Sequence, residues 1–415
     1  MVSPSEHSPS TTASLASLPE YHLDYALWDP ADVTSDRSQS FVRALRRAMV
    51  GIGFFYLHNS PLNTGNTGKT NRRANMFSLC DRLFNLPLKD RLSIDMDNSR
   101  HFRGYCKFGD ERTLSLQDHR DQVDYGLHVA PLQVSESVLE TRPYLNLYGP
   151  NQFLDDATLP GHREIVIDWF ETANEICKQL TRAVELALGV QEGRMSQYLN
   201  GSQPEESGAG KDEELDKLGP LPFARMKTIR YPAGEVVDGI KRIEGSEQGV
   251  GAHKDSGWLT LLSTSSVGGL QAQDFDGKWI SVPHVEGSTI VNFGQQVENL
   301  TGGIVQSATH RVVFPSTATQ TRYSVAWFSF PALNALLKPL DVAREFSDEV
   351  LELWKKAEAR RQGKGIVSDV PKGDLFASQH ERFGWIAWRG LVRSHPGVVR
   401  RFYSDVDAPR SRQEP

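Results

Sequence analysis

The sequence predicts a mixed α+β protein in which helices flank a compact two-sheet β-core. First, short β-rich segments separated by turn residues fill residues 224–330 at sandwich-like intervals. Second, apolar residues recur at helical spacing over residues 162–188, and Gly189 follows as a C-cap. Third, a helical pattern returns after about residue 340. The chain has 415 residues, 39% of them apolar, which is enough to bury such a core.

The segments before the β-core also have expected structures. Residues 1–20 are rich in Ser, Pro and Thr and are expected to form a disordered tail. Residues 40–59 indicate a helix that leads into the strand "GFFYLHN", and residues 74–87 indicate a helix that ends at Pro87. Residues 151–218 are expected to hold the scaffold helix and an acidic surface insertion, and residues 336–415 a C-terminal helical extension.

Charge and cysteine content narrow the classes of function. A net charge of −6, with no Lys/Arg run longer than a pair, gives no electrostatic reason to expect nucleic acid or an anionic membrane as a partner. Cys80, Cys106 and Cys177 lie far apart and form no CxxC motif, so neither a disulfide framework nor a zinc knuckle is predicted. A reducing compartment fits these cysteines best, so we expect a cytoplasmic protein, with a monomer as the default expectation.

The segment "GAHKDSGWLTLL" places His253 and Asp255 two residues apart in a strand-like run. Alternate residues of a strand point to the same face, so the imidazole and the carboxylate would point to one place. Two ligands do not make a metal site, because Fe(II) oxygenases use two His and one carboxylate. His310, 57 residues after His253 on another predicted strand, is the candidate for the third ligand.

An Arg-x-Ser motif, Arg322 and Ser324, comes 12 residues after His310. A guanidinium group binds a carboxylate through two charge-assisted hydrogen bonds, and the Ser324 hydroxyl can donate a third. One β-core can therefore hold a metal together with a carboxylate-bearing ligand.

Two further HxD copies, His22–Asp24 and His119–Asp121, are not followed by a spaced His and Arg-x-Ser, and we interpret them as structural. His284-Val285-Glu286 lies between Pro283 and Gly287 and is interpreted as a turn. Four other histidines are interpreted as ordinary surface or loop residues: His58, His101, His128 and His395.

In this order the residues resemble the core signature of the 2-oxoglutarate and Fe(II)-dependent dioxygenases of the isopenicillin N synthase-like group: H-x-D, a distal H, then R-x-S. Segments along most of the chain are similar to that family's successive signatures: "GFFYLHN", "FNLPLKDRL", "RGYCKFGDE", "IRYPAGE", "GLQAQDFDGKWISVP" and "TIVNFGQQVENLTGG…HRVVFP". The resemblance implies a double-stranded β-helix (jelly-roll) core at residues 219–335, preceded by an N-terminal dioxygenase-type region at residues 21–150.

The resemblance also implies ligands. His253, Asp255 and His310 would bind Fe(II). Arg322 and Ser324 would bind the far carboxylate of 2-oxoglutarate, and Tyr231 would support it. O2 is the other implied cosubstrate, and ascorbate is expected to stimulate. The family's pocket location makes six residues candidates for substrate contacts: Arg103, Tyr105, Phe108, Lys227, Phe328 and Phe330.

The chain departs from the family pattern at two places. Ile229 stands where many relatives carry Asn, two residues before the Tyr of Tyr-Pro. "NFGQ", residues 292–295, stands where Asn-x-Gly-Asp is usual, so neither of its polar side chains is assigned a catalytic role.

The implied reaction is hydroxylation, desaturation or ring closure of a small organic molecule of secondary-metabolite, amino-acid or nucleobase type, with release of succinate and CO2. One alternative is an isopenicillin N synthase-type iron oxidase or cyclase that does not use 2-oxoglutarate and holds its own substrate's carboxylate with Arg-x-Ser. Another is a small-molecule-binding protein without catalysis.

Overall fold

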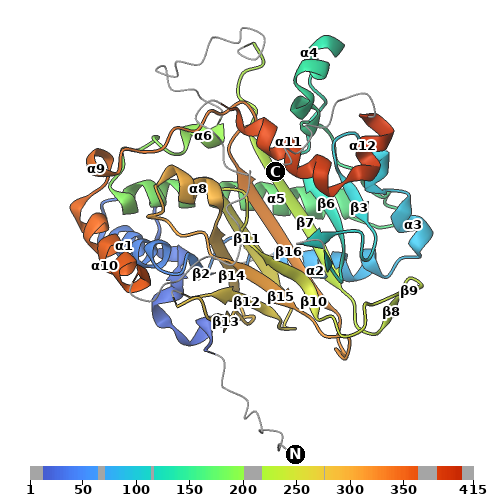
Figure 1. Cartoon of the computed structure of the whole chain (residues 1–415), viewed down its shortest axis with the longest axis horizontal. Helices are drawn as coiled ribbons and strands as arrows, with labels where there is room; N and C mark the ends of the chain where they lie inside the picture. The colour runs from blue at the N-terminus through green and yellow to red at the C-terminus, as the bar shows by residue number, and fades with distance from the viewer. Residues whose placement is uncertain are drawn as a thin grey trace, which may run out of the picture.

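The computed structural model describes residues 13–63, 71–113, 116–200, 217–274, 276–362 and 381–403. It confirms the expected α+β class with a jelly-roll core: an eight-stranded sheet and a four-stranded sheet form the centre, and helices surround them (Figure 1). The larger sheet consists, in spatial order, of β1 (His22–Asp24), β2 (Phe54–His58), β14 (Ser288–Phe293), β11 (Leu259–Thr264), β16 (Arg322–Phe330), β7 (Phe223–Tyr231), β6 (Asp121–Gly126) and β3 (Gly104–Cys106).

The smaller sheet carries the first candidate ligands. Its strands, in spatial order, are β10 (Gln248–His253), β15 (His310–Val313), β12 (Leu270–Gln273) and β13 (Trp279–Ser281). Two hairpins complete the strands: β4 (Arg112–Thr113) with β5 (Leu116–Gln117), and β8 (Val236–Val237) with β9 (Ile240–Lys241).

The helices come mainly before and after the core strands. They are α1 (Asp36–Val50), α2 (Arg72–Phe84), α3 (Leu88–Leu92), α4 (Glu136–Thr141), α5 (His162–Leu188), α6 (Gln197–Asn200), α8 (Gln295–Leu300), α9 (Val342–Glu345), α10 (Asp348–Gln362), α11 (Phe383–Ser394) and α12 (Pro396–Phe402). Short 3-10 helices are Leu15–Ser17, Pro19–Tyr21, Tyr25–Leu27, Met96–Asn98 and Pro143–Leu147. None of the helices in the described ranges combines the length and apolar character needed to cross a bilayer.

The long helix α5 lies behind the larger sheet and supports its outer face (Figure 1). It spans the predicted residues 162–188, and Gly189 ends it at φ 75°, a left-handed conformation that suits glycine. The ring of Phe170 meets the edge of Trp327 on β16 at 5.8 Å, and α2 adds Phe84 against Tyr323. Because Trp327 and Tyr323 face outward, the alternate residues of β16 face the inside of the jelly roll.

Residues 13–20 differ from the expected disordered tail. Leu15 is fully buried, and the carbonyl of Ala13 accepts a hydrogen bond from the amide of Ser281 on β13 at 2.9 Å. The buried apolar side chain and the pairing with an edge strand hold this short polar stretch in place. Residues 1–12 and 201–216, which include most of the acidic insertion, lie outside the described residues.

The C-terminal helices α11 and α12 lie over the β7–β6–β3 end of the larger sheet (Figure 1). Phe383, at the start of α11, stacks on Phe330 of β16 at 5.8 Å, and Tyr403, just after α12, stacks on Phe102 at 5.9 Å. This extension therefore packs against Phe330 at the end of β16 and against Phe102 before β3.

Candidate functional site

Three potential metal ligands gather on the smaller sheet. His253 ends β10, His310 begins β15 and the two are paired in register, while Asp255 lies two residues beyond the end of β10. Nε2 of each imidazole lies 3.7 Å from Oδ1 of Asp255, and the ring centroids are 4.3 Å apart. One ion can therefore be reached by all three side chains.

Backbone carbonyls orient both imidazoles. Nδ1 of His253 lies 2.8 Å from the carbonyl oxygen of Gly251, and Nδ1 of His310 lies 3.1 Å from that of Ala308. A carbonyl only accepts, so each Nδ1 carries a proton, and in a neutral imidazole with that tautomer the lone pair lies on Nε2. That tautomer is the one a metal ligand needs.

Asp255 is oriented in the same way. Its Oδ2 accepts hydrogen bonds from the Thr260 hydroxyl at 2.5 Å and from the Asn292 amide at 2.7 Å, so Oδ1 is the atom that faces the imidazoles. Thr260 lies on β11 and Asn292 on β14, which ties the ligand to the larger sheet.

Electrostatics keep His253 and Asp255 in the protonation states that bind metal. Burial and the neighbouring His310 lower the pKa of His253 to about 4. Burial alone would raise the pKa of Asp255, but His310 and His253 lower it below its usual value. At neutral pH the cluster therefore offers a carboxylate, and His253 is a neutral imidazole.

Arg322 lies on the inner face of β16, opposite Tyr231 of β7. Its guanidinium carbon is 4.7 Å from the centre of the Tyr231 ring, and the side chain is 1% exposed. Among the described residues no acceptor reaches its Nε or Nη1. A buried guanidinium with unmet donors is unfavourable unless an anion binds there.

Ser324 shares this face with Arg322, two residues along the strand. A Cβ added at Gly249 of β10 would lie 3.1 Å from the Tyr231 ring. The Arg322–Tyr231 pair therefore packs against the strand that carries His253.

The other HxD copies have internal partners. Asp121 binds Arg230 on the outer face of the sheet, and the amide of Ile243 donates to His119. His22 contacts the His58 ring at 2.9 Å. His284 lies 3.1 Å from Glu286 in the expected turn.

Four substrate candidates lie on the inner face of the larger sheet. Lys227, Phe328 and Phe330 occupy inward positions of β7 and β16, and each is only partly buried. Arg103 precedes β3 and is 1% exposed, with its guanidinium against Gly126 of β6.

Tyr105 and Phe108 differ from that expectation. Tyr105 points to the outer face, where its hydroxyl donates to Asp121 at 3.0 Å. Phe108 is 1% exposed and lies between the His119 ring and the guanidinium of Arg242. Strand alternation in β3 turns Tyr105 away from the inside, and the contacts of Phe108 are those of a core residue, which argues against substrate contact for both.

Two family models match the chain. That of the 2OG-Fe(II) oxygenase superfamily matches residues 228–331, and that described as the non-haem dioxygenase in morphine synthesis N-terminal region matches residues 23–156. The chain belongs to the 2OG-Fe(II) oxygenase superfamily. It is a 2-oxoglutarate-dependent dioxygenase, and its cofactor and cosubstrate are Fe(II) and 2-oxoglutarate.

Relatives of this oxygenase include a fungal and a plant enzyme. It is 28% identical over 365 residues to the 2-oxoglutarate-dependent dioxygenase frbJ of Dothideomycetidae sp. (strain 11243). The matched region covers 88% of this chain and 87% of the relative. It is 26% identical over 308 residues to homoarginine-6-hydroxylase 2-ODD-C23.1 of Arabidopsis thaliana, covering 73% and 80%. Full-length Neurospora crassa T7H in complex with alpha-KG shares the fold, with a TM-score of 0.58 at 20% identity, covering 79% of this chain and 90% of that one.

The residues of this oxygenase fit Fe(II) and 2-oxoglutarate. Two Nε2 atoms and one carboxylate oxygen form the donor set expected for non-haem iron, and the unmet donors of Arg322 suit a carboxylate.

Sequence reasoning assigned no role to Asn292, yet its amide fixes Asp255. The position of Asn292 on a core strand could have indicated a role near the metal ligands. No role was assigned because "NFGQ" lacks the Asp that is usual in this motif. Thr260 was missed because a hydroxyl in "WLTLL" looks like an ordinary strand residue.

Proposed function

We propose that this dioxygenase hydroxylates a small organic molecule, with His253, Asp255 and His310 as the Fe(II) ligands. Arg322 and Ser324 bind the far carboxylate of 2-oxoglutarate, with Tyr231 beside them. Desaturation or ring closure remains a variant of the same C–H oxidation, because it differs only in the step after hydrogen removal. The observation that carries the proposal is the pairing of an oriented two-histidine, one-carboxylate cluster with a buried guanidinium whose donors are unmet.

Each side chain has a distinct task in this proposal. The carbonyls behind His253 and His310 keep the Nε2 lone pairs aimed at one point, and Thr260 and Asn292 hold the Asp255 carboxylate. Arg322 fixes one end of 2-oxoglutarate, so that its other end has a single orientation toward the metal. When bound, Fe(II) would supply the redox chemistry that couples O2 and 2-oxoglutarate decarboxylation to oxidation of a C–H bond.

Hydroxylation is favoured by the names of relatives. The Arabidopsis relative is named a homoarginine-6-hydroxylase. A solved complex of Neurospora crassa T7H contains alpha-KG and thymine. Both names point to small polar substrates, and we propose a substrate of amino-acid, nucleobase or secondary-metabolite type.

The test is substrate-stimulated formation of succinate. The full chain, with Fe(II), 2-oxoglutarate and ascorbate, is incubated with candidate metabolites, and succinate and product mass are measured. We expect one succinate per product and a product heavier by one oxygen atom. Product formed without succinate would instead identify an isopenicillin N synthase-type oxidase. Iron binding without O2 uptake across the panel would support a protein that binds but does not catalyse.

A further inference from the structure

The inner face of β7, β6 and β3 carries an unusual group of buried charges. Register and alternation place Arg225 and Lys227 of β7 beside Asp124 of β6 on the same side as Arg322. We call the full group the inner charge cluster: Arg103, Arg120, Arg225, Lys227, Glu111, Asp118 and Asp124.

The carboxylates of this cluster are shared among more cations than they can neutralise. Asp124 is bound by Arg225 at 2.8 Å and lies 3.6 Å from the Lys227 ammonium. Arg120 serves both Asp118, at 3.2 Å, and Glu111, at 3.5 Å.

His395, which lies beside Glu111, does not add to the positive charges of the inner charge cluster. Although burial alone would raise the pKa of Asp124 and of Glu111, Lys227 and its neighbours lower both, so both stay ionised. Burial lowers the pKa of His395, which keeps that ring neutral at pH 7. Four cations thus face three carboxylates.

The excess charge coincides with unmet hydrogen-bond donors. Within the described part of the chain, Arg225 Nη1 and both Nε and Nη1 of Arg103 are buried without an acceptor. Arg225 is 5% exposed and Arg103 1%. The Lys227 side chain, however, is 19% exposed although it faces inward. Lys227 is therefore the member of the group that a ligand can reach.

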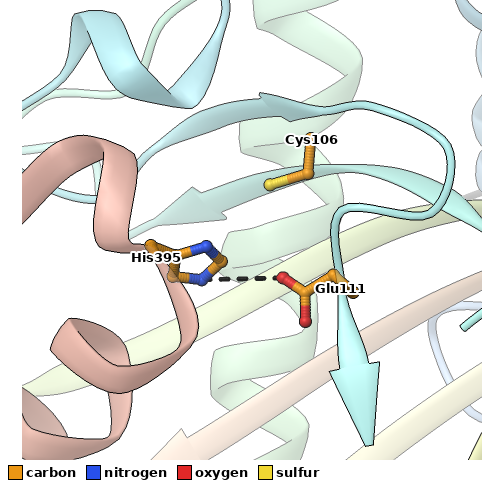
Figure 2. Close-up of side chains that lie close together, drawn as sticks. All are labelled: Cys106, Glu111 and His395. Carbon is orange, nitrogen blue, oxygen red and sulfur yellow. Dashed lines mark ion pairs between the residues drawn. The ribbon is translucent and has the colours of Figure 1, made fainter. Parts of the chain in front are cut away.

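A second metal does not explain the cluster. Cys106, Glu111 and His395 lie close enough to suggest one, and Figure 2 shows His395, from the α11–α12 junction, paired with Glu111. However, the Glu111 carboxylate is already engaged by Arg120 and by the Gln122 amide. A cation would have to enter a region that already has excess positive charge, so an anion is the ligand that the electrostatics favour.

The cluster is also near the proposed metal site. Phe328 of β16 is paired with Arg225 on one side and with Thr260, which binds Asp255, on the other. Neighbouring strands are about 4.8 Å apart, so the backbone at Arg225 lies roughly 10 Å from that at Thr260. A molecule held at Arg225 and Lys227 can extend along Phe328 toward the iron ligands.

We infer that Arg225 and Lys227, with Arg103 behind them, bind a carboxylate of the substrate, so that this enzyme oxidises an organic acid. The inference rests on the proposed function and deepens it, because it gives the substrate a charge and an orientation. The carboxylate lies at the cluster, and an apolar part beside Phe328 and Phe330 points toward the metal.

Binding of a matched pair of probes tests the inference without turnover. The full chain is loaded with Mn(II) and 2-oxoglutarate under argon, so that Arg322 is occupied, and titrated calorimetrically with phenylacetate or with phenylacetamide. We expect the acid to bind at least about 10-fold more tightly than the amide. Equal affinities, tighter binding of the amide, or no binding of the acid would overturn the inference.

Variants locate the effect. In Lys227→Met and in Arg225→Gln, the ratio of the affinities for phenylacetate and phenylacetamide is expected to fall to near one. If Lys227→Met does not fold, the milder Lys227→Gln replaces it. Lys278→Met, at an exposed position between β12 and β13, is the control and should keep the wild-type preference. Loss of the preference in the control, or its survival in all cluster variants, would contradict the assignment.

A kinetic experiment separates this inference from the proposed function. In the succinate assay, active compounds are compared with their methyl esters. We expect esterification, and Lys227→Gln, to raise substrate KM at least about 10-fold while the 2-oxoglutarate KM is unchanged. Active neutral compounds would overturn the organic-acid inference alone. Absence of succinate with every compound would overturn the proposed function, whereas the probe titration would still report on the cluster.

Discussion

Two aspartates on one strand, Asp121 and Asp124 of β6, belong to buried charge clusters on opposite faces of the same sheet. On the outer face Asp121 binds both Arg230, through two hydrogen bonds, and Arg91, while Asp238 completes a balanced set of two arginines and two aspartates. No guanidinium nitrogen of that described set lacks an acceptor. On the inner face Asp124 is one of three carboxylates opposed by four cations.

The difference separates charges that hold the fold from charges that are available to a ligand. The outer cluster satisfies itself and joins α3, β6, β7 and the β8–β9 hairpin. The inner cluster and Arg322 keep buried donors unmet, which is unfavourable until an anion binds. Four predictions test this contrast between the two faces.

The largest expected effect comes from replacing each of the two HxD aspartates in turn. Asp255→Ala should abolish Fe(II) binding and activity, because it removes one of three donors and the only negative charge among them. Asp121→Ala should leave Fe(II) affinity intact in the folded fraction. Calorimetric titration with Fe(II) under argon measures both, and equal loss in the two variants would mean that the wrong copy was assigned to the metal.

The second largest effect is expected for Arg230→Met, and it is a loss of folding stability. It leaves the buried Asp121 carboxylate short of its bidentate partner, and breaking such a pair costs about 3–5 kcal/mol. Urea unfolding monitored by circular dichroism gives the value. The 2-oxoglutarate KM should not change, and a KM that rose with little loss of stability would reverse the roles given to the two faces.

Arg322→Met should raise the 2-oxoglutarate KM and leave folding stability nearly unchanged, which is the opposite of the result expected for Arg230→Met. Loss of even one charge-assisted hydrogen bond, worth about 1.5–3 kcal/mol, should raise the 2-oxoglutarate KM by at least roughly 10- to 100-fold. Since the guanidinium has unmet donors without ligand, unfolding in the absence of 2-oxoglutarate should change little. The KM for 2-oxoglutarate and the urea midpoint are measured on the same preparation. An unaltered KM would count against the assignment.

Lys227→Met should have the smallest effect on folding. It removes the excess positive charge, so we expect the stability to change by less than about 1 kcal/mol or to increase slightly. Differential scanning calorimetry without ligand provides the measurement. A loss as large as that of Arg230→Met would show that Lys227 holds the fold.

The parts of the molecule that the sequence predicted depend on local periodicity or on ordered motifs. The bounds of α5 result from one apolar stripe and a glycine C-cap. Alternation in β16 places Arg322 and Ser324 on one face, and the convergence of His253, Asp255 and His310 was expected from the family signature. Each of these needs only short-range geometry or a known order of residues.

The inner charge cluster could not be predicted, because its members come from segments far apart in the chain. His395 was interpreted as an ordinary surface or loop residue, but the packing of α11 and α12 buries it beside Glu111, 284 positions earlier. Asp124 and Arg225 lie in strands whose pairing sets their neighbourhood. Tyr105 was placed among substrate candidates because the motif gives its position but not the face to which its strand turns it.

The covering of the β7–β6–β3 end by α11 and α12 brings the end of the chain against a cluster built by much earlier residues. The superfamily match ends at residue 331, whereas the helices that enclose the inner charge cluster begin at Phe383. The residues proposed to hold the substrate, Arg225, Lys227, Phe328 and Phe330, lie on β7 and β16, so the final helices enclose that region without supplying these side chains. Replacing the final segment by that of a related enzyme is therefore expected to change how the inner charge cluster is enclosed, while its charged residues and the cluster of His253, Asp255 and His310 stay the same.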